Sequence, residues 1–214
     1  MSLSLEYMIR EPKIKRDKNP LLLLLHGYGS NEADLFSFAT ELPDEYYVVS
    51  ARAPHDLQYG SYAWFAINFD AGMNKFTNIE QAKESRALIV KFIDELLDKY
   101  PIDSEKITLV GFSQGSILSY AVALSHPEKI SQVAALSGYI DPEIFADGAT
   151  AKDFSNLRIF ASHGSVDQVI PIAWARKVKP FLENLKINVD YREYPVGHGV
   201  APQNFFDFRE WLQQ

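Results

Sequence analysis

Short apolar runs recur along the chain and are separated by longer, periodic segments. Runs that are solidly apolar and bounded by turn residues are expected of strands buried on both faces of a parallel sheet. Such runs occupy residues 21–25, 46–49, 107–110, 133–136 and 157–161. Residues 3–9 and 187–194 alternate between apolar and polar positions, which favours half-buried strands. The pattern therefore predicts a mostly parallel sheet.

Helical periodicity appears between these predicted strands. Thr77 followed by Glu80 forms a capping-box pattern, which predicts the start of a helix that ends near Pro101. Further helices are predicted at residues 116–124, 171–185 and 202–212. Alternating strands and helices indicate an α/β fold, in which ligands bind at the carboxyl ends of the strands. Candidate chemistry is therefore expected just after each apolar run.

Composition narrows the class of protein. The length of 214 residues predicts a single domain over residues 1–214. The net charge of -7 argues against a nucleic-acid partner, and the absence of cysteine excludes disulfides, thiolate nucleophiles and cysteine-bound metals. The run at 21–25 is too short to cross a bilayer, which takes about 20 residues, and residues 1–10 do not resemble a signal peptide. We therefore expect no stable membrane insertion and a cytoplasmic location.

The segment Gly111-Phe112-Ser113-Gln114-Gly115 has the pattern G-x-S-x-G. It follows a predicted strand and opens a predicted helix, which is the placement that a nucleophile elbow requires. Small residues must flank the serine because the turn is tight. The alternative is a glycine-rich turn in which Ser113 only caps the helix. The context favours Ser113 as a nucleophile.

A nucleophilic serine needs a base, and the base needs an acid that orients it. Among five histidines, His198 follows the last predicted strand and lies between two glycines, so it is the predicted base. Structural roles are expected for His55, His126 and His163. Asp167 follows the penultimate strand and is the predicted acid, with Asp141 as the alternative. The chain order Ser113, Asp167, His198 is that of α/β hydrolases, unlike the chymotrypsin and subtilisin orders.

The segment His26-Gly27-Tyr28-Gly29 directly follows the leucine-rich run. Its glycines allow the backbone to approach a substrate, so it is a candidate oxyanion loop. The predicted donors are the backbone N–H groups of Tyr28 and Gln114, while His26 keeps the loop in shape. An ordinary glycine-rich turn is the alternative.

These blocks resemble the phospholipase/carboxylesterase family of small α/β hydrolases, which includes acyl-protein thioesterases. The resemblance also covers Gly164, the segment Val169-Ile170-Pro171, and Trp64-Phe65. It implies an α/β-hydrolase fold with helices on both faces of a mostly parallel sheet, and hydrolysis of carboxylic esters or thioesters without metal or organic cofactor. The short stretch between Ser137 and Leu157 leaves no room for a large cap domain.

The resemblance also implies where substrate preference is set. Trp64 is expected to stand beside Ser113, and with Phe65 it is a predicted substrate-binding residue. The stretch from Gly60 to Phe76 is aromatic and shows no clear strand or helix period, so its rings either bind an acyl chain or pack structurally. Two positions depart from the family pattern. Ala66 stands where the family often has an acidic residue, and Gly199 where it often has serine.

The sequence therefore predicts a serine hydrolase that acts on small-molecule or lipid acyl esters. Alternatives within this class are an acyl-protein thioesterase, whose partner is an acylated protein, a lysophospholipase and a peptidase. A non-catalytic binding protein on the same scaffold is the alternative outside it. A metal hydrolase is disfavoured because H-E-x-x-H is absent. The sequence is also compatible with a homodimer.

Overall fold

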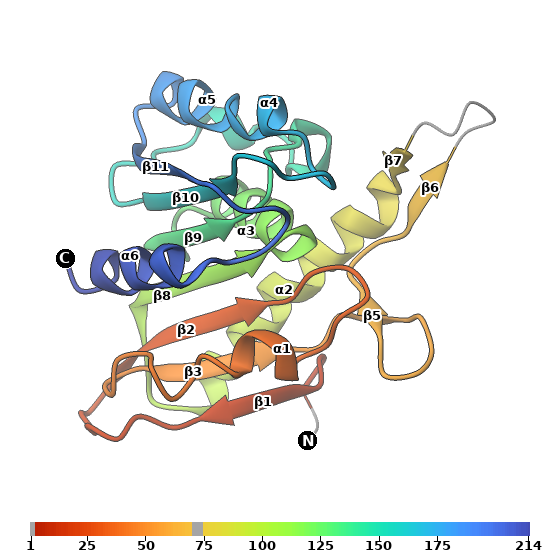
Figure 1. The fold of residues 1–214 in the computed structure, drawn as a ribbon. Coiled ribbons are helices and arrows are strands. Elements are labelled where there is room, and N and C mark those ends of the chain that lie inside the picture. The colour runs from red at the N-terminus through yellow and green to blue at the C-terminus, as the bar shows by residue number, and fades with distance from the viewer. Residues whose placement is uncertain (1–2, 70–74) are drawn as a thin grey trace.

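The computed structural model describes residues 3–69 and 75–214, and this part of the chain is built on one seven-stranded sheet with the order β1-β3-β2-β8-β9-β10-β11 (Figure 1). The sheet strands are β1 (Tyr7–Arg10), β2 (Asn19–Leu25), β3 (Tyr47–Ala51), β8 (Ile102–Phe112), β9 (Gln132–Leu136), β10 (Arg158–Gly164) and β11 (Asn188–Tyr194). Only β1 is antiparallel to its neighbour, so the predicted mostly parallel sheet is confirmed.

The leucine run in β2 shows why the sheet is covered on both faces. Leu21, Leu23 and Leu25 belong to one hydrophobic core, whereas Leu22 and Leu24 belong to the other. Successive side chains of a strand point to opposite faces, so a solidly apolar strand needs a cover on each side. β2 lies between β3 and β8 in the sheet, which also pairs its backbone on both edges.

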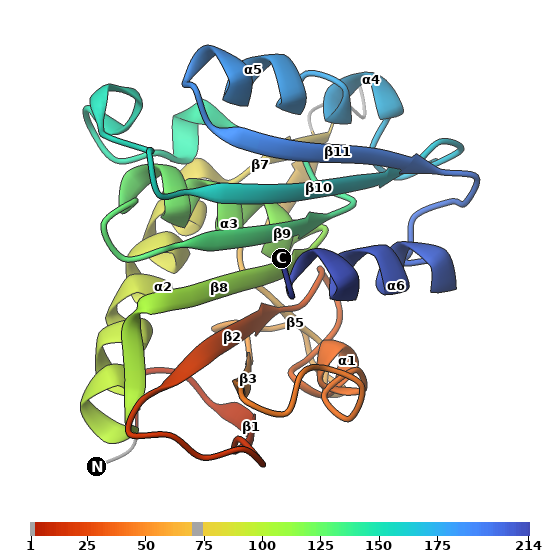
Figure 2. The same ribbon diagram turned by 90° about the vertical axis from the view of Figure 1, so that its left-hand side faces the viewer.

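Helices supply both covers (Figures 1 and 2). One face carries α2 (Ile79–Lys99), α3 (Gln114–Ser125) and α5 (Val178–Asn184), which contribute to the larger core. The opposite face carries α1 (Ala33–Phe36) and α6 (Pro202–Trp211) over the smaller core. α3 is buried along its whole length, because it packs on β2, β8 and β9 of the sheet and is also contacted by α2 and the connection after β9. The predicted helices on both faces are thus confirmed.

Three local expectations are wrong. The N-cap of α2 is Asn78 and not Thr77, because the Asn78 side-chain oxygen accepts the Gln81 N–H at 3.2 Å. The helix expected at 171–185 is divided into α4 (Ile172–Ala175) and α5. Pro180 lacks an N–H for the carbonyl of Arg176 and its ring would clash with that carbonyl, so α4 does not continue into α5. In the first turn of α5, Pro180 needs no N–H partner.

The first strand is also shorter than the expected 3–9. It starts at Tyr7, because Ser4 donates its N–H and hydroxyl to the Glu95 carboxylate, each at 2.7 Å, and not to a neighbouring strand.

The aromatic segment from Gly60 to Phe76 and the residues just before it contain strands that the sequence does not reveal. They form two short antiparallel pairs outside the main sheet. These are β4 (His55–Asp56) with β5 (Tyr62–Ala63), and β6 (Ile67–Phe69) with β7 (Lys75–Thr77). The side chains of Phe69 and Phe76 lie outside the part of the chain that the structure describes.

The connection that follows β9 is short. Between Ser137 and Leu157 the chain forms only the two 3₁₀ turns η1 (Pro142–Ile144) and η2 (Ala149–Ala151), so the expected absence of a large cap agrees with these described residues. In the described ranges, none of the helices combines the length and the apolar character needed to span a bilayer.

Candidate active site

Ser113 stands in the turn between β8 and α3, with φ of 54° and ψ of -115°. This region is costly for a residue with a side chain, and such strain concentrates at functional sites. Its N–H is held by the Leu136 carbonyl at 3.0 Å. A Cβ on Gly115 would lie 1.9 Å from the Leu25 carbonyl oxygen, and one on Gly111 would lie 2.3 Å from the Gly115 backbone. The two glycines are therefore required because α3 starts against the ends of β2 and β8.

Two loops bring the predicted base and acid to Ser113. The His198 Nε2 lies 3.0 Å from the Ser113 Oγ, and its Nδ1 lies 2.7 Å from the Asp167 Oδ2. The loops after β10 and β11 remain paired past the strands, since Ser165 donates to the Tyr194 carbonyl at 2.7 Å. They also touch at Gly164, where a Cβ would lie 2.2 Å from the Gly197 carbonyl oxygen.

The environment of Asp167 keeps its carboxylate charged. Its side chain is fully buried, and its Oδ1 accepts the N–H groups of Val169 and Ile170 at 2.7 and 2.9 Å. Burial alone would raise the pKa of Asp167, but the hydrogen bonds from His198, Ile170 and Val169 outweigh it and lower the pKa. A charged Asp167 fixes the His198 tautomer, because Nδ1 must carry the proton that it donates. Nε2 is then free to accept a proton from Ser113.

The alternative acid, Asp141, lies elsewhere. Its carboxylate accepts the Glu143 N–H at 3.1 Å and caps η1. Within the described part of the chain, Asp141 makes no hydrogen bond with His198. Burial raises the pKa of Asp141, so its surroundings favour the neutral form. Of the remaining histidines, His126 contacts Glu128 at 3.2 Å and His163 lies near Asp167.

The backbone N–H groups of Tyr28 and Gln114 are the predicted oxyanion donors, and neither has a protein acceptor within the described part of the chain. His26 shapes the first of the two loops. Its Nδ1 lies 2.7 Å from the Gly27 carbonyl, and its Nε2 accepts the Ala53 N–H at 3.1 Å. Burial lowers the pKa of His26, which keeps the ring neutral in this role.

Trp64 differs from the expectation. Its side chain is fully buried and donates its Nε1–H to the His26 carbonyl at 3.0 Å, so it supports the oxyanion loop from behind. It does not line the cavity next to Ser113, whereas Phe65 does. Trp64 and Phe65 follow each other in a bend between β5 and β6, and of the two only Phe65 lines the cavity.

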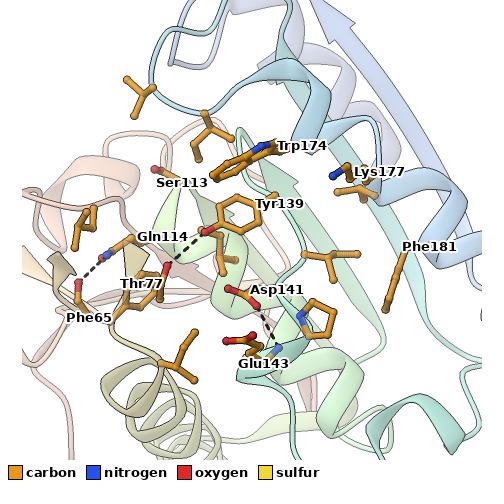
Figure 3. Close-up of a pocket in the computed structure, with 18 residues that line it drawn as sticks. Phe65, Thr77, Ser113, Gln114, Tyr139, Asp141, Glu143, Trp174, Lys177 and Phe181 are labelled. Atoms are coloured by element: carbon orange, nitrogen blue, oxygen red, sulfur yellow. Dashed lines mark hydrogen bonds between the residues drawn. The ribbon is translucent and has the colours of Figure 1, made fainter. Parts of the chain in front are cut away.

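The Gln114 side chain has a role that the sequence did not reveal. Its Oε1 accepts the Trp64 N–H at 3.1 Å, and its Nε2 donates to the Phe65 carbonyl at 2.7 Å (Figure 3). The amide therefore satisfies two buried backbone groups of the segment that carries Phe65. No motif marks this contact, because it joins residues that are far apart in the sequence.

A cavity of about 760 Å³ opens next to Ser113. In Figure 3, Tyr139 lies between Trp174 and the pair Asp141 and Glu143. Most of the residues that line the cavity are apolar: Phe65, Ile67, Ile79, Ile117, Tyr139, Ile140, Pro142, Val169, Ile170, Trp174, Val178 and Phe181. Sequence reasoning found only Phe65 among these. Trp174 follows Pro171 in the loop-to-helix segment after Asp167, and its place there is the one signal that could have indicated it.

No group of three or more histidine or acidic side chains within residues 3–69 and 75–214 is arranged to hold a metal ion. The polar residues along the cavity are Thr77, Ser113, Gln114, Asp141, Glu143 and Lys177. The site is therefore assembled from a serine, a histidine and carboxylates around an apolar pocket.

Known proteins share this architecture. The esterase PE8 superimposes with a TM-score of 0.83 at 24% identity, covering 98% of each chain. Among curated relatives, acyl-protein thioesterase 1 of Mycosarcoma maydis is 27% identical over 98% of this chain and 97% of its own. The probable carboxylesterase SOBER1-like of Arabidopsis thaliana is 26% identical over 90% of this chain and 78% of its own.

The fold is that of the α/β hydrolases, as the resemblance implied. The family model described as phospholipase/carboxylesterase matches residues 8–214, so the chain belongs to that family. It is a hydrolase of the phospholipase/carboxylesterase type.

Proposed function

We propose that this protein hydrolyses carboxylic esters or thioesters through an acyl-enzyme formed on Ser113. One observation carries the proposal: the hydrogen-bonded series Ser113–His198–Asp167, with distances of 3.0 and 2.7 Å, ends at an apolar cavity. A serine hydroxyl paired with a neutral imidazole and a buried carboxylate is the arrangement that activates a nucleophile.

In the first half of the reaction, the His198 Nε2 takes the Ser113 hydroxyl proton as Oγ attacks the acyl carbonyl. Asp167 stabilises the imidazolium that results, without taking the proton itself. The carbonyl oxygen becomes an oxyanion and receives the N–H groups of Tyr28 and Gln114. The Gln114 donor stands at the N-terminus of α3, where the helix dipole also favours negative charge.

In the second half, His198 gives its proton to the leaving alcohol or thiol. A water molecule then enters, His198 takes a proton from it, and the hydroxide attacks the acyl-enzyme. The acid leaves and Ser113 regains its proton. Each proton moves through the same nitrogen, which is why one histidine is sufficient for both halves.

The cavity next to Ser113 supports an acyl group with an apolar chain. Each methylene that it removes from water contributes up to ~0.8 kcal/mol. Both kinds of relative agree with this substrate class, since one is named an acyl-protein thioesterase and the other a probable carboxylesterase. An acylated protein is therefore a candidate substrate besides small esters and lysophospholipids. The cytoplasmic location, the single domain and the homodimer remain predictions.

Replacement of the nucleophile tests the proposal. Ser113→Ala should abolish ester hydrolysis and labelling by a fluorophosphonate probe, with the melting temperature retained. Ser104→Ala is a matched control, because Ser104 is exposed on β8 at the end away from the site. Ester hydrolysis by the Ser113→Ala protein at the wild-type rate would rule out the acyl-enzyme.

A panel that shares one acyl group separates the activities. The octanoyl group is offered as the p-nitrophenyl ester, the coenzyme A thioester, the lysophospholipid and the p-nitroanilide. The largest kcat/KM identifies the preferred leaving group. Activity on the anilide comparable to that on the ester would favour the peptidase alternative over the esterase.

A further inference from the structure

A second histidine, His163, lies beside Asp167 and takes no part in the proposed proton transfer. It is the last residue but one of β10, and its side chain is fully buried, as is that of Asp167. Strand-end packing was the role expected from the sequence. Packing alone would be served by an apolar side chain, whereas a buried imidazole loses its hydrogen bonds to water and needs partners in the protein.

The neighbours of His163 fix its tautomer. Its Nε2 lies 2.9 Å from the Ile170 carbonyl oxygen and 3.3 Å from the Asp167 Oδ2. A carbonyl and a carboxylate only accept hydrogen bonds, so Nε2 carries a proton and donates it to Ile170. Nδ1 has no partner among the described residues. A proton on Nδ1 would bury another N–H without an acceptor, so the geometry favours the neutral ring.

The bond to Ile170 closes a ring of contacts around the carboxylate. Ile170 offers its carbonyl to His163 and donates its N–H to the Asp167 Oδ1 at 2.9 Å. We infer that His163 is a positioning residue for Asp167: it fastens the 167–170 turn to the end of β10, so that the Asp167 Oδ2 faces His198. The catalytic consequence rests on the proposed function, whereas the tautomer and the anchoring do not.

Apart from Ile170, which is buried, the apolar side chains at this turn contribute little packing. Val166 and Val169, on either side of Asp167, are 58% and 50% exposed. β10, in contrast, is paired on both edges, with β9 and with β11. His163 therefore ties the buried residues Asp167 and Ile170 of a partly exposed turn to a strand in the interior of the sheet.

Charged groups around His163 do not offer it another partner. Glu193 is its register partner on β11, but Arg176 holds that carboxylate with two hydrogen bonds of 2.8 Å. Asp167 is the only carboxylate within ion-pair distance of His163 in the described part of the chain. A substitution at position 163 therefore removes contacts with Asp167 and the Ile170 carbonyl.

The wild-type protein gives the first test. In ¹⁵N-labelled protein at pH 7, the imidazole nitrogen shifts of His163 should report a neutral ring with the proton on Nε2. A ring protonated on Nδ1, as the other tautomer or as the cation, would overturn the inference. This measurement needs no substrate, so its result does not depend on whether Ser113 is the nucleophile.

Two substitutions separate positioning from packing. His163→Gln keeps an N–H near the place of Nε2, and His163→Met fills a similar volume without a donor. We expect His163→Met to lower kcat up to about 100-fold, with KM within about twofold, while His163→Gln stays within about fivefold of wild type. The downfield proton resonance of the Asp167–His198 hydrogen bond should shift or broaden in His163→Met and remain in His163→Gln.

His126→Met is the matched control, since the His126 side chain hydrogen-bonds with Glu128 at the end of α3, away from the site. If His163→Met keeps the wild-type kcat and an unchanged downfield resonance, His163 only packs and does not position Asp167, whatever the melting temperature of the variant. If His163→Met does not fold, the comparison of His163→Gln with wild type decides: a 100-fold loss of kcat despite the retained donor would contradict the inference. Activity that survives Ser113→Ala would instead refute the proposed function alone.

Discussion

Asp167 and Asp141 lie in the loops that follow two neighbouring strands, β10 and β9, yet the protein treats these carboxylates in opposite ways. Asp167 is fully buried and accepts hydrogen bonds from Val169, Ile170 and His198. Asp141 accepts one, from Glu143. The pKa of Asp167 is lowered and that of Asp141 is raised, although burial pushes both upward. The number of donors therefore decides the direction of the pKa shift.

The comparison indicates a division of labour between the two loops. The β10 loop surrounds its carboxylate with donors and directs it at His198. The β9 loop instead contributes Tyr139, Ile140 and Asp141 to the cavity wall. A carboxylate that orients a base must stay charged and fixed, whereas one in a pocket wall need only contact what enters the pocket.

The largest effect is expected on activity. Asp167→Asn should lower kcat/KM for a p-nitrophenyl ester by about 10⁴-fold, as the corresponding change does in chymotrypsin-type enzymes, because the amide no longer fixes the His198 tautomer. Asp141→Asn should change kcat/KM by less than about threefold, since the amide oxygen still caps η1. Steady-state kinetics of both proteins make the comparison, and a greater loss at Asp141 would reverse the assignment of the acid.

The cavity wall should govern chain-length preference. From p-nitrophenyl acetate to octanoate, kcat/KM should rise by up to about fourfold per methylene and level off once the cavity is full. Ile140→Ala, in the β9 loop, should lower the octanoate value by about tenfold and leave acetate unchanged. Ile14→Ala is the control, since Ile14 is exposed and does not line the cavity. A steady fall from acetate onward would mean that the wall is structural.

Stability should separate the two carboxylates by the sign of its pH dependence. The lowered pKa of Asp167 means that its contribution is present above its unfolded pKa, about 3.9, and is lost as pH falls through the folded value. The raised pKa of Asp141 gives the reverse: its contribution is present at acid pH and is lost as pH rises through the folded value.

Melting temperatures at pH 3.5 and pH 7 measure this difference. Relative to wild type, Asp167→Asn should be more destabilising at pH 7 than at pH 3.5. Asp141→Asn should gain about 1–3 °C at pH 7 and little at pH 3.5. If the change in melting temperature between pH 3.5 and pH 7, relative to wild type, had the same sign in both variants, the surroundings of the two carboxylates would be alike.

The smallest expected effect is that of a chelator. Neither acidic loop belongs to a group of side chains suited to a metal within the described residues, so EDTA should leave the hydrolysis rate unchanged. Loss of activity that returns on addition of one particular divalent ion would require a different role for one of the two carboxylates.

The parts of this picture that follow from the sequence are those with a local cause. The strand-to-helix turn at Ser113 needs glycines at its two ends, and the solid leucine run needs a cover on each face, so both are visible in the residue pattern. The order of Ser113, Asp167 and His198 further suggested which strand ends would meet. The mostly parallel sheet with helices on both faces is confirmed on this basis.

Features that depend on distant contacts could not be predicted. Whether Trp64 or Phe65 faces the cavity depends on a backbone bend at these two residues, which hydrogen bonds to the distant Gln114 hold. The break before α5 was missed because helical periodicity continues across Pro180. His163 looked like a strand-end residue because its partner Ile170 belongs to the following turn.

The amide of Gln114 has a consequence for how the pocket and the reaction centre communicate. Its two hydrogen bonds hold the backbone of residues 64 and 65 in a bend, through one side chain. The same residue carries a proposed oxyanion donor on its backbone. The wall that carries Phe65 and the start of α3 are therefore joined through one residue, whose side chain holds the wall and whose backbone N–H faces the proposed site of the developing charge. The shape of the pocket wall and the proposed oxyanion site thus depend on the same residue.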